Sequence, residues 1–295
     1  MSTASHKPAA AEGLDWNSQE MDELLERALA EDIGPGDITT AAVLAEAVEA
    51  TGTFQANASL VVAGLPLVQR LYALLDPSIN FHAIAEEGAL VARGPLAVAK
   101  GDARALLRGE RTALNFLQRL CGIATLTRRY ALRLEGTKAK LLDTRKTTPG
   151  LRVLERYAVR IGGGSNHRSG LFDAVLIKEN HAELAGGVGA AVRRARRQGA
   201  GQKIEVEARD LAEVRDALEA GADAVLLDNM TVHDVRLAVG LVAGRVPVEV
   251  SGGITLENIR DYAEQGVDFI SVGALTHSAP AADISFEVFA GHGRA

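Results

Sequence analysis

The chain has 295 residues, of which 47% are hydrophobic and 24% charged, so it can bury a full core and its composition is not that of a disordered protein. The formal net charge of -6 at pH 7 argues against a nucleic-acid or anionic-membrane partner, because those surfaces attract an excess of positive charge. Cys121 is the one cysteine and cannot form an internal disulfide, and no apolar run reaches the roughly 18 residues of a membrane span. We therefore expect a cytoplasmic protein with no membrane partner.

The N-terminal part of the sequence predicts a loose tail followed by an α+β domain. Residues 1–13 lack an apolar core, and we expect them to be a disordered tail. Residues 17–31 carry an apolar stripe at helical spacing and predict an amphipathic helix. The later elements of this domain are predicted as strand-like segments at 51–63, 79–91 and 95–107, and as helices at 67–75 and 110–134. We place the domain at residues 14–120.

From Lys138 the pattern changes to short apolar strands that alternate with helices, which is typical of βαβ units and a parallel sheet. The strands are predicted at 139–143, 174–178, 204–207, 224–228, 246–250 and 269–272. The helices are predicted at 151–161, 188–197, 211–220, 232–242 and 256–265, with Thr148-Pro149 and Thr255 at helix starts. Six strands are too few for a closed eight-stranded barrel, so the pattern leaves open an incomplete barrel or an open sheet.

The end of the chain predicts a return to the first domain. Residues 284–289 alternate like an edge strand, and we assign residues 281–295 to the N-terminal domain. The domain with the alternating strands and helices then occupies residues 121–280. Because ligands of α/β barrels bind at the carboxyl ends of the strands, we expect the functional site in that domain.

Cations follow the first two predicted strands of this domain and occur in the Gly-rich loop between them. They are Arg145, Lys146, His167, Arg168, Lys178 and His181. Guanidinium groups bind planar carboxylates through two parallel hydrogen bonds, whereas the ammonium groups of lysines are better matched to phosphate oxygens. Charges at the ends of buried strands are not the pattern of a solvated helix face, so these residues predict a pocket for a strongly anionic ligand.

Acidic side chains follow the next two strands. Glu205 and Glu207 are two residues apart on one strand, so they point to the same face. If that face is the interior, Glu207 and Asp228 meet at the mouth and offer oxygens for Mg2+ or for sugar hydroxyls. They could instead form salt bridges with Lys178 and Arg145, and the sequence leaves both interpretations open.

A glycine-rich turn follows the fifth predicted strand. Ser251, Gly252 and Gly253 would present bare backbone N–H groups, and a helix expected to open at Thr255 would add its positive end. Gly273 follows the next strand and would close the other side of the same phosphate site. The alternative is that these glycines make tight turns and nothing more.

Long motifs in this chain resemble those of the quinolinate phosphoribosyltransferase family. The matching segments are DTRKTTPGLR from Asp143, RIGGGSNHR from Arg160, LIKENH from Leu176, EVE from Glu205, LLDNM from Leu226, VSGGI from Val250 and DFISVGALTHS from Asp268. Further matches are EDIG from Glu31, GDIT from Gly36 and ERTALN from Glu110. The resemblance covers nearly everything except the first dozen residues.

The resemblance implies a fold and a reaction. The fold is an N-terminal α/β sandwich joined to an incomplete parallel α/β barrel, which would resolve the strand count. The reaction transfers the phosphoribosyl group of phosphoribosyl pyrophosphate to quinolinate with decarboxylation, and gives nicotinate mononucleotide, pyrophosphate and carbon dioxide in NAD biosynthesis. The resemblance also implies Mg2+ as a cofactor, and a homodimer, open to further assembly, in which each site is completed by the neighbour.

Residue roles also follow from the resemblance. The two carboxylates of quinolinate would be held by Arg145, His167, Arg168 and Lys178, together with Arg111 of the neighbouring subunit. Glu207 and Asp228 would hold the ribose and Mg2+, and Lys146 would meet the pyrophosphate. The 5'-phosphate would be held by Ser251, Gly252, Gly253, Gly273 and His277. The catalytic residues would be Lys146, Lys178, Glu207 and Asp228.

Other functions stay open on the sequence. A paralogue from molybdate-transport loci has a similar sequence, and quinolinate turnover would distinguish the two. Lys178 at a barrel strand also fits a Schiff-base aldolase, although the pair of Arg145 and Arg168 argues against it. A non-catalytic phosphate-binding scaffold would leave Glu207 and Asp228 at the strand ends without a reason.

Overall fold

The structure is a computed structural model and describes residues 14–199 and 201–291. The chain divides into two units. The first takes the chain up to Leu126, residues 160–162 and the chain from Ala279 onward, and the second takes Thr127–Val159 and Gly163–Ser278. The predicted tail at residues 1–13 lies outside the described residues. The domain boundaries given above stay predictions.

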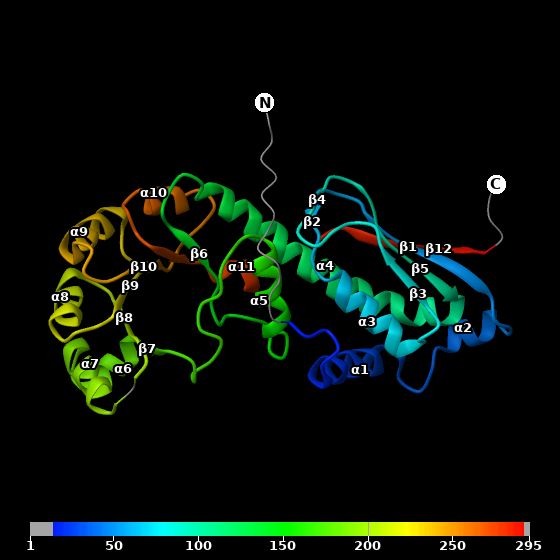
Figure 1. Cartoon of the computed structure of the whole chain (residues 1–295), viewed down its shortest axis with the longest axis horizontal. Helices are drawn as coiled ribbons and strands as arrows, with labels where there is room; N and C mark the ends of the chain where they lie inside the picture. Colours follow the sequence, from blue (N-terminus) through cyan, green and yellow to red (C-terminus); the bar gives the residue numbers. More distant parts are fainter. Residues whose placement is uncertain (1–13, 200, 292–295) are drawn as a thin grey trace. The chain divides into compact units, whose positions relative to one another are not determined.

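An antiparallel sheet in the order β12-β1-β5-β3 forms the centre of the first unit (Figure 1). Its strands are β1 (Glu49–Ala56), β3 (Asn80–Ala83), β5 (Gly94–Asp102) and β12 (Ile284–Ala290). A second, two-stranded sheet pairs β2 (Leu60–Val61) with β4 (Leu90–Val91). β12 pairs with β1 from Ala50↔Ala290 to Ala56↔Ile284, so a strand from near the C-terminal end of the described chain completes a sheet built from its earlier part.

Aromatic rings form the core beside this sheet. The ring centroid of the fully buried Phe54 lies 4.4 Å from that of Phe286 on β12 and 6.2 Å from that of Tyr72. Tyr72 belongs to α3 (Leu65–Leu75). The ring of Phe286 fills the space that a Cβ at Gly52 would need, which explains a glycine in the middle of β1.

The helices of the first unit depart from the prediction at two places. The short helix α2 (Ile38–Val43) was not predicted, whereas α1 (Gln19–Ile33) lies where a helix was expected. The helix α4 (Ala103–Arg133) begins well before residue 110, and the predicted strand at 95–107 is therefore too long. The reason is Asp102, whose carboxylate accepts the backbone N–H of Arg104 at 2.9 Å and so starts the helix.

The second unit contains a six-stranded sheet in the order β6-β11-β10-β9-β8-β7, and its neighbours are parallel. The strands are β6 (Lys140–Leu142), β7 (Val175–Ile177), β8 (Ile204–Ala208), β9 (Ala224–Asp228), β10 (Val248–Ser251) and β11 (Phe269–Ser271). Strands β6 and β7 are consecutive in the chain and lie at opposite edges of the sheet. An incomplete parallel barrel is therefore confirmed as the fold of this unit.

Helices cover the outer face of this curved sheet (Figure 1). They are α7 (Val188–Arg197), α8 (Leu211–Glu219), α9 (Val232–Val242) and α10 (Ile259–Ala263). The unit also contains α5 (Arg152–Ile161), α6 (Glu179–Ala185) and α11 (Ala274–His277). None of the helices within residues 14–199 and 201–291 combines the length and the apolar character that crossing a membrane requires.

Two helix starts in the second unit differ from the prediction. Thr148 does not cap α5, because its N–H and hydroxyl bond to the carboxylate of Glu155 and the helix begins later, at Arg152. The helix α10 begins at Ile259 and not near Thr255, because the Asn258 side chain bonds to the Thr255 N–H and the Gly253 carbonyl and closes a turn there. The positive helix end expected beside the glycine-rich turn is therefore absent from that position.

The segment between β6 and β7 extends the edge of the sheet. Ser165 forms a parallel bridge with Leu142, on the side of β6 that β11 does not occupy. The Ser165 N–H donates to the Leu141 carbonyl at 2.8 Å, and the Asp143 N–H donates to the Ser165 carbonyl at 3.1 Å. This pairing fixes the chain immediately before His167.

Candidate active site

A cavity of about 350 Å³ opens at the carboxyl ends of the parallel strands, within the second unit. Eight of the residues predicted for the site line it: Arg145, Lys146, His167, Arg168, Lys178, Glu207, Asp228 and Ser251. They come from four strand ends and the segment after β6, so positions far apart in the sequence share one hollow. Arg111 belongs to the first unit, where its side chain is exposed on α4.

Two guanidinium groups form the cationic side of the cavity. Burial lowers the pKa of Arg168, and the positive charge of Arg145 lowers it further. The two cations therefore repel one another where solvent screening is weak, and an anionic ligand would relieve that repulsion. Arg152 holds their loops, since its Nε donates to Thr147 at 3.0 Å and its Nη1 donates to the Ser169 carbonyl at 2.9 Å.

Asp143 fixes the loop that carries His167 and Arg168. Its side chain is 1% exposed and accepts the His167 N–H at 2.8 Å and the Asn166 amide at 2.6 Å. Burial raises the pKa of this carboxyl, and the N–H of His167 and the charge of Arg156 oppose the rise. Asp143 thus acts on the shape of the site from beneath the loop.

Glu207 and Asp228 form the acidic side of the cavity, from β8 and β9. The Nζ of Lys178 lies 3.1 Å from a carboxylate oxygen of Glu207, so the ion pair considered as an alternative from sequence is formed. Burial raises the pKa of Asp228, and the negative charge of Glu207 raises it further. Two carboxylates that repel one another in this way suit a divalent cation such as Mg2+, which takes oxygen ligands.

The glycine-rich turn after β10 takes its shape from left-handed backbone. Gly252 has φ +89° and Gly253 has φ +63°, and a Cβ at Gly252 would collide with the Asn229 side chain. The tight-turn interpretation therefore accounts for these two glycines by itself. The residues that line the cavity do not include Gly252, Gly253, Gly273 or His277.

Gly273 nevertheless lies close to the cavity. A Cβ at this position would be 2.9 Å from the Cδ of Lys146 and 3.2 Å from the Nε2 of His277. The hydroxyl of Thr276 donates to the Lys146 carbonyl at 2.7 Å and holds the two segments together. Glycine is thus needed where the backbone after β11 approaches Lys146, a residue of the cavity wall.

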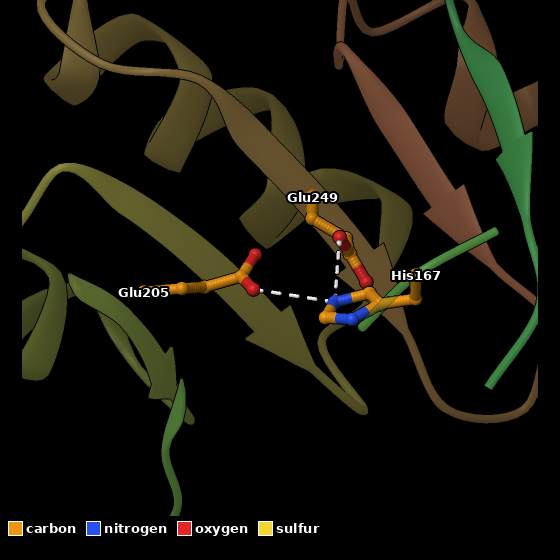
Figure 2. A group of neighbouring side chains, drawn as sticks. All are labelled: His167, Glu205 and Glu249. Atoms are coloured by element: carbon orange, nitrogen blue, oxygen red, sulfur yellow. Dashed lines mark ion pairs between the residues drawn. The ribbon is translucent and has the colours of Figure 1, made fainter. Parts of the chain in front are cut away.

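Figure 2 shows the side chains of His167, Glu205 and Glu249 as one cluster, in which both dashed ion pairs meet at one ring nitrogen of His167. His167 and Glu249 also line the cavity. The Nε2 of His167 lies 3.2 Å from Glu205 and 3.5 Å from Glu249. Its Nδ1 accepts the Arg168 N–H at 2.7 Å, and the Ser271 hydroxyl donates to Glu249. Burial lowers the pKa of His167, whereas the hydrogen bonds to Glu205 and Glu249 raise it, so the three groups together favour one bound proton beyond the one on Nε2. Burial raises the pKa of Glu249.

Sequence reasoning missed four polar residues of the lining: Thr144, Arg152, Glu249 and Ser271. A signal for Glu249 exists, because it precedes Ser251 by two positions on an alternating strand and so shares its face. No spacing distinguishes Arg152 from a surface arginine, since its part in the site depends on contacts with loops on either side of α5.

An incomplete α/β barrel with a cationic and an acidic side to one cavity defines a class of protein, the barrel enzymes that bind anionic substrates. The sequence matches the family described as Quinolinate phosphoribosyl transferase, N-terminal domain, over residues 37–121 and C-terminal domain over residues 123–287. The chain belongs to the quinolinate phosphoribosyltransferase family, whose members are pentosyltransferases.

Individual relatives agree with this assignment. The probable nicotinate-nucleotide pyrophosphorylase (carboxylating) of Bacillus subtilis is 41% identical over 275 residues, which cover 92% of this chain and 94% of that protein. Quinolinate phosphoribosyltransferase (decarboxylating) 2a, mitochondrial, of Nicotiana tabacum is 40% identical over 286 residues, which cover 90% and 81%. The solved nicotinate-nucleotide pyrophosphorylase of Francisella tularensis is 40% identical and superposes with a TM-score of 0.89 over 96% of this chain and 100% of that one.

Proposed function

We propose that the protein transfers the phosphoribosyl group of phosphoribosyl pyrophosphate to quinolinate with loss of carbon dioxide, and so supplies nicotinate mononucleotide for NAD biosynthesis. The observation that carries this proposal is one cavity in which Arg145 and Arg168 lie near each other while Glu207 and Asp228 lie near each other. A planar diacid requires the first environment and an activated sugar requires the second.

The cationic side would bind quinolinate. Arg145, Arg168 and Lys178 would pair with its two carboxylates, and the guanidinium groups would fix the plane of the ring through paired hydrogen bonds. We assign His167 to the quinolinate-binding side of the cavity as well. Bringing the dianion next to a sugar pyrophosphate requires that their repulsion be offset, which the cations of the cavity wall would do.

The acidic side would bind the sugar. Glu207 and Asp228 would hold the ribose hydroxyls and Mg2+, which when bound neutralises charge on the leaving pyrophosphate. Lys146 would contact the pyrophosphate. The 5'-phosphate would lie against backbone N–H groups and side chains of Ser251, Gly252, Gly253, Gly273 and His277. Support for the phosphate site comes from the short approach of Gly273 to Lys146 and His277.

The chemical steps follow from these positions. As the bond from the sugar C1 to pyrophosphate breaks, positive charge develops at that carbon, and Glu207 and Asp228 would stabilise it. The lone pair of the quinolinate nitrogen then forms the new bond to C1 and leaves a cationic ring. That ring accepts the electron pair of the adjacent carbon–carboxylate bond when carbon dioxide leaves, and a proton, for which Lys146 is our candidate donor, replaces the lost carboxylate.

A Schiff-base aldolase fits the site less well. The Nζ of Lys178 lies 3.1 Å from a carboxylate oxygen of Glu207, so it is engaged in an ion pair where a Schiff-base enzyme needs a free amine. The paralogue of molybdate-transport loci would share the barrel and much of the cavity wall, so only an assay of quinolinate turnover distinguishes the two.

Release of carbon dioxide from carboxyl-labelled quinolinate tests the proposal. We expect release that depends on both phosphoribosyl pyrophosphate and Mg2+, with formation of equal amounts of nicotinate mononucleotide, because decarboxylation requires the cationic ring made by transfer. No release with all three components present would refute the proposed function and favour the paralogue. Trapping of Lys178 by borohydride with a carbonyl substrate would favour the aldolase.

We also propose a homodimer, open to further assembly, in which Arg111 of the partner subunit completes each site, in the cytoplasm. Arg111→Ala and Asp228→Asn should each be nearly inactive alone. Mixed and allowed to exchange, they should recover about a quarter of the native activity, because half of the dimers become hybrids and each hybrid has one intact site. No recovery, although exchange is demonstrated by mass spectrometry of labelled subunits, would place Arg111 in its own subunit's site.

A further inference from the structure

We propose that Glu205 and Glu249 are positioning residues, which hold the imidazole of His167 so that the ring in turn fixes the backbone of Arg168 at the mouth of the cavity. The inference deepens the proposed function and rests on it, because Arg168 is assigned to quinolinate. The cluster connects β8, β10 and the segment after β6, and its three side chains point toward one another (Figure 2).

The hydrogen bonds of His167 determine which of its ring nitrogens carries a proton. Its Nδ1 accepts the Arg168 N–H at 2.7 Å, so that nitrogen carries no proton and Nε2 carries one. The Nε2–H then points at the carboxylates of Glu205 and Glu249, at 3.2 and 3.5 Å. Both ring nitrogens are thus engaged within the protein, and His167 acts on the ligand through Arg168.

Hydrogen bonds restrain both the backbone and the side chain of Arg168. The backbone N–H of Arg168 donates to the imidazole of His167, and the guanidinium of Arg168 donates to the Ala174 carbonyl at 3.1 Å. The His167 carbonyl accepts from Arg156 at 2.6 Å, so the peptide between the two residues is held on both sides. A rotation of the imidazole would remove one of these two restraints, and the guanidinium would then be held less firmly in register with a planar carboxylate.

Besides the proton on Nε2 of His167, the cluster of His167, Glu205 and Glu249 favours a second proton. We assign this second proton to the carboxyl group of Glu249. An imidazolium would direct a second N–H at the Arg168 N–H, and two donors would then face each other. Glu249 is 3% exposed, and the Ser271 hydroxyl donates to its other oxygen. A neutral Glu249 beside a hydrogen-bonded Glu205 avoids two unscreened negative charges beneath the cationic side of the cavity.

The same geometry argues against a metal at this cluster. One ligand atom from each of His167, Glu205 and Glu249 lies within 4.8 Å of the others, as a metal site would require. A metal on Nε2 would force the ring proton onto Nδ1, where the Arg168 N–H already points. Metal-bound histidines normally donate their second N–H to an oxygen, and this ring has the opposite arrangement.

Leucine and glutamine variants test the positioning role. Glu205→Leu and Glu249→Leu should each raise KM for quinolinate about 10- to 100-fold, the usual effect of losing a hydrogen bond to a charged or buried partner, with KM for phosphoribosyl pyrophosphate unchanged. Glu249→Gln should recover nearly native KM, because a carboxamide has the shape of a neutral carboxyl, and Glu205→Gln should recover part of it. Glu213→Leu, on the outer helix α8, is the control and should change neither constant.

A spectroscopic measurement keeps the inference testable apart from turnover. Nitrogen-15 NMR of the imidazole should show His167 protonated at Nε2 and unprotonated at Nδ1, with and without quinolinate, and a changed pattern in Glu205→Leu. A proton on Nδ1, one stoichiometric zinc lost in His167→Ala, or unchanged quinolinate KM in a folded double leucine variant would overturn the inference. If the wild-type chain does not turn over quinolinate, the proposed function fails, while the NMR pattern still decides the hydrogen bonding.

Discussion

Replacement of Arg145 with alanine should raise the quinolinate KM by about 100- to 1,000-fold, since loss of one partner of a buried, charge-assisted pair costs roughly 2–5 kcal/mol. The structure puts Arg145 close enough to Arg168 to depress its pKa, so the pair is poised around an anion. The sugar phosphate would bind on the other side of the cavity. Its affinity, measured by calorimetry with Mg2+ present, should be unchanged.

Two controls give this result its meaning. Arg145→Lys keeps the charge without the planar fork, and we expect it to recover part of the affinity. Arg209→Ala removes an exposed arginine paired with Glu213 and should leave both substrates unaffected. Normal quinolinate affinity in Arg145→Ala would refute the assignment of the diacid to this side of the cavity.

Asp228→Asn and Glu207→Gln should each lower kcat by about 100- to 1,000-fold, with less effect on KM for quinolinate. Each change keeps the shape of the side chain and removes a negative charge next to the carbon where positive charge would develop. The pKa of Asp228 is raised by burial and then by Glu207, so the two carboxylates interact, and their effects should not add. Single-turnover kinetics of each variant and of the double variant measure this coupling.

The Mg2+ dependence separates two explanations of such a loss. If Glu207 and Asp228 hold the ion, the variants should need more Mg2+ for half-maximal rate, whereas a purely electrostatic effect would leave that concentration unchanged. Glu264→Gln, which removes an exposed carboxylate paired with Arg260, should change neither quantity. A native kcat in Asp228→Asn would contradict the assigned role.

The alternation of strands and helices could be predicted from the sequence because the strands are short apolar runs and the intervening helices are strongly periodic. The acids of the site could be found because they lie at the ends of strands, and the alternation of Glu205 and Glu207 fixes their face. Lys178 could be found because it directly follows β7. The family motifs then decided between an open sheet and an incomplete barrel, which the count of strands could not do.

Features that depend on side-chain contacts were not accessible in the same way. The start of α10 is set by the Asn258 side chain and that of α5 by Glu155, and both override the Thr signals nearby. The bridge of Ser165 to Leu142 involves a single residue and has no strand pattern. Hydrogen bonds at both ring nitrogens of His167 likewise become visible only when three separate segments are brought together.

The position of β12 has a consequence for synthesis of the protein. The sheet that begins near residue 49 receives its edge strand from residues 284–290, together with Phe286 of its aromatic core. On the ribosome, the barrel can therefore assemble before the first unit has received β12, the last strand of its sheet. The part of the chain that is made first becomes complete last, and until then it exposes an unpaired β1 edge that chaperones or aggregation could engage.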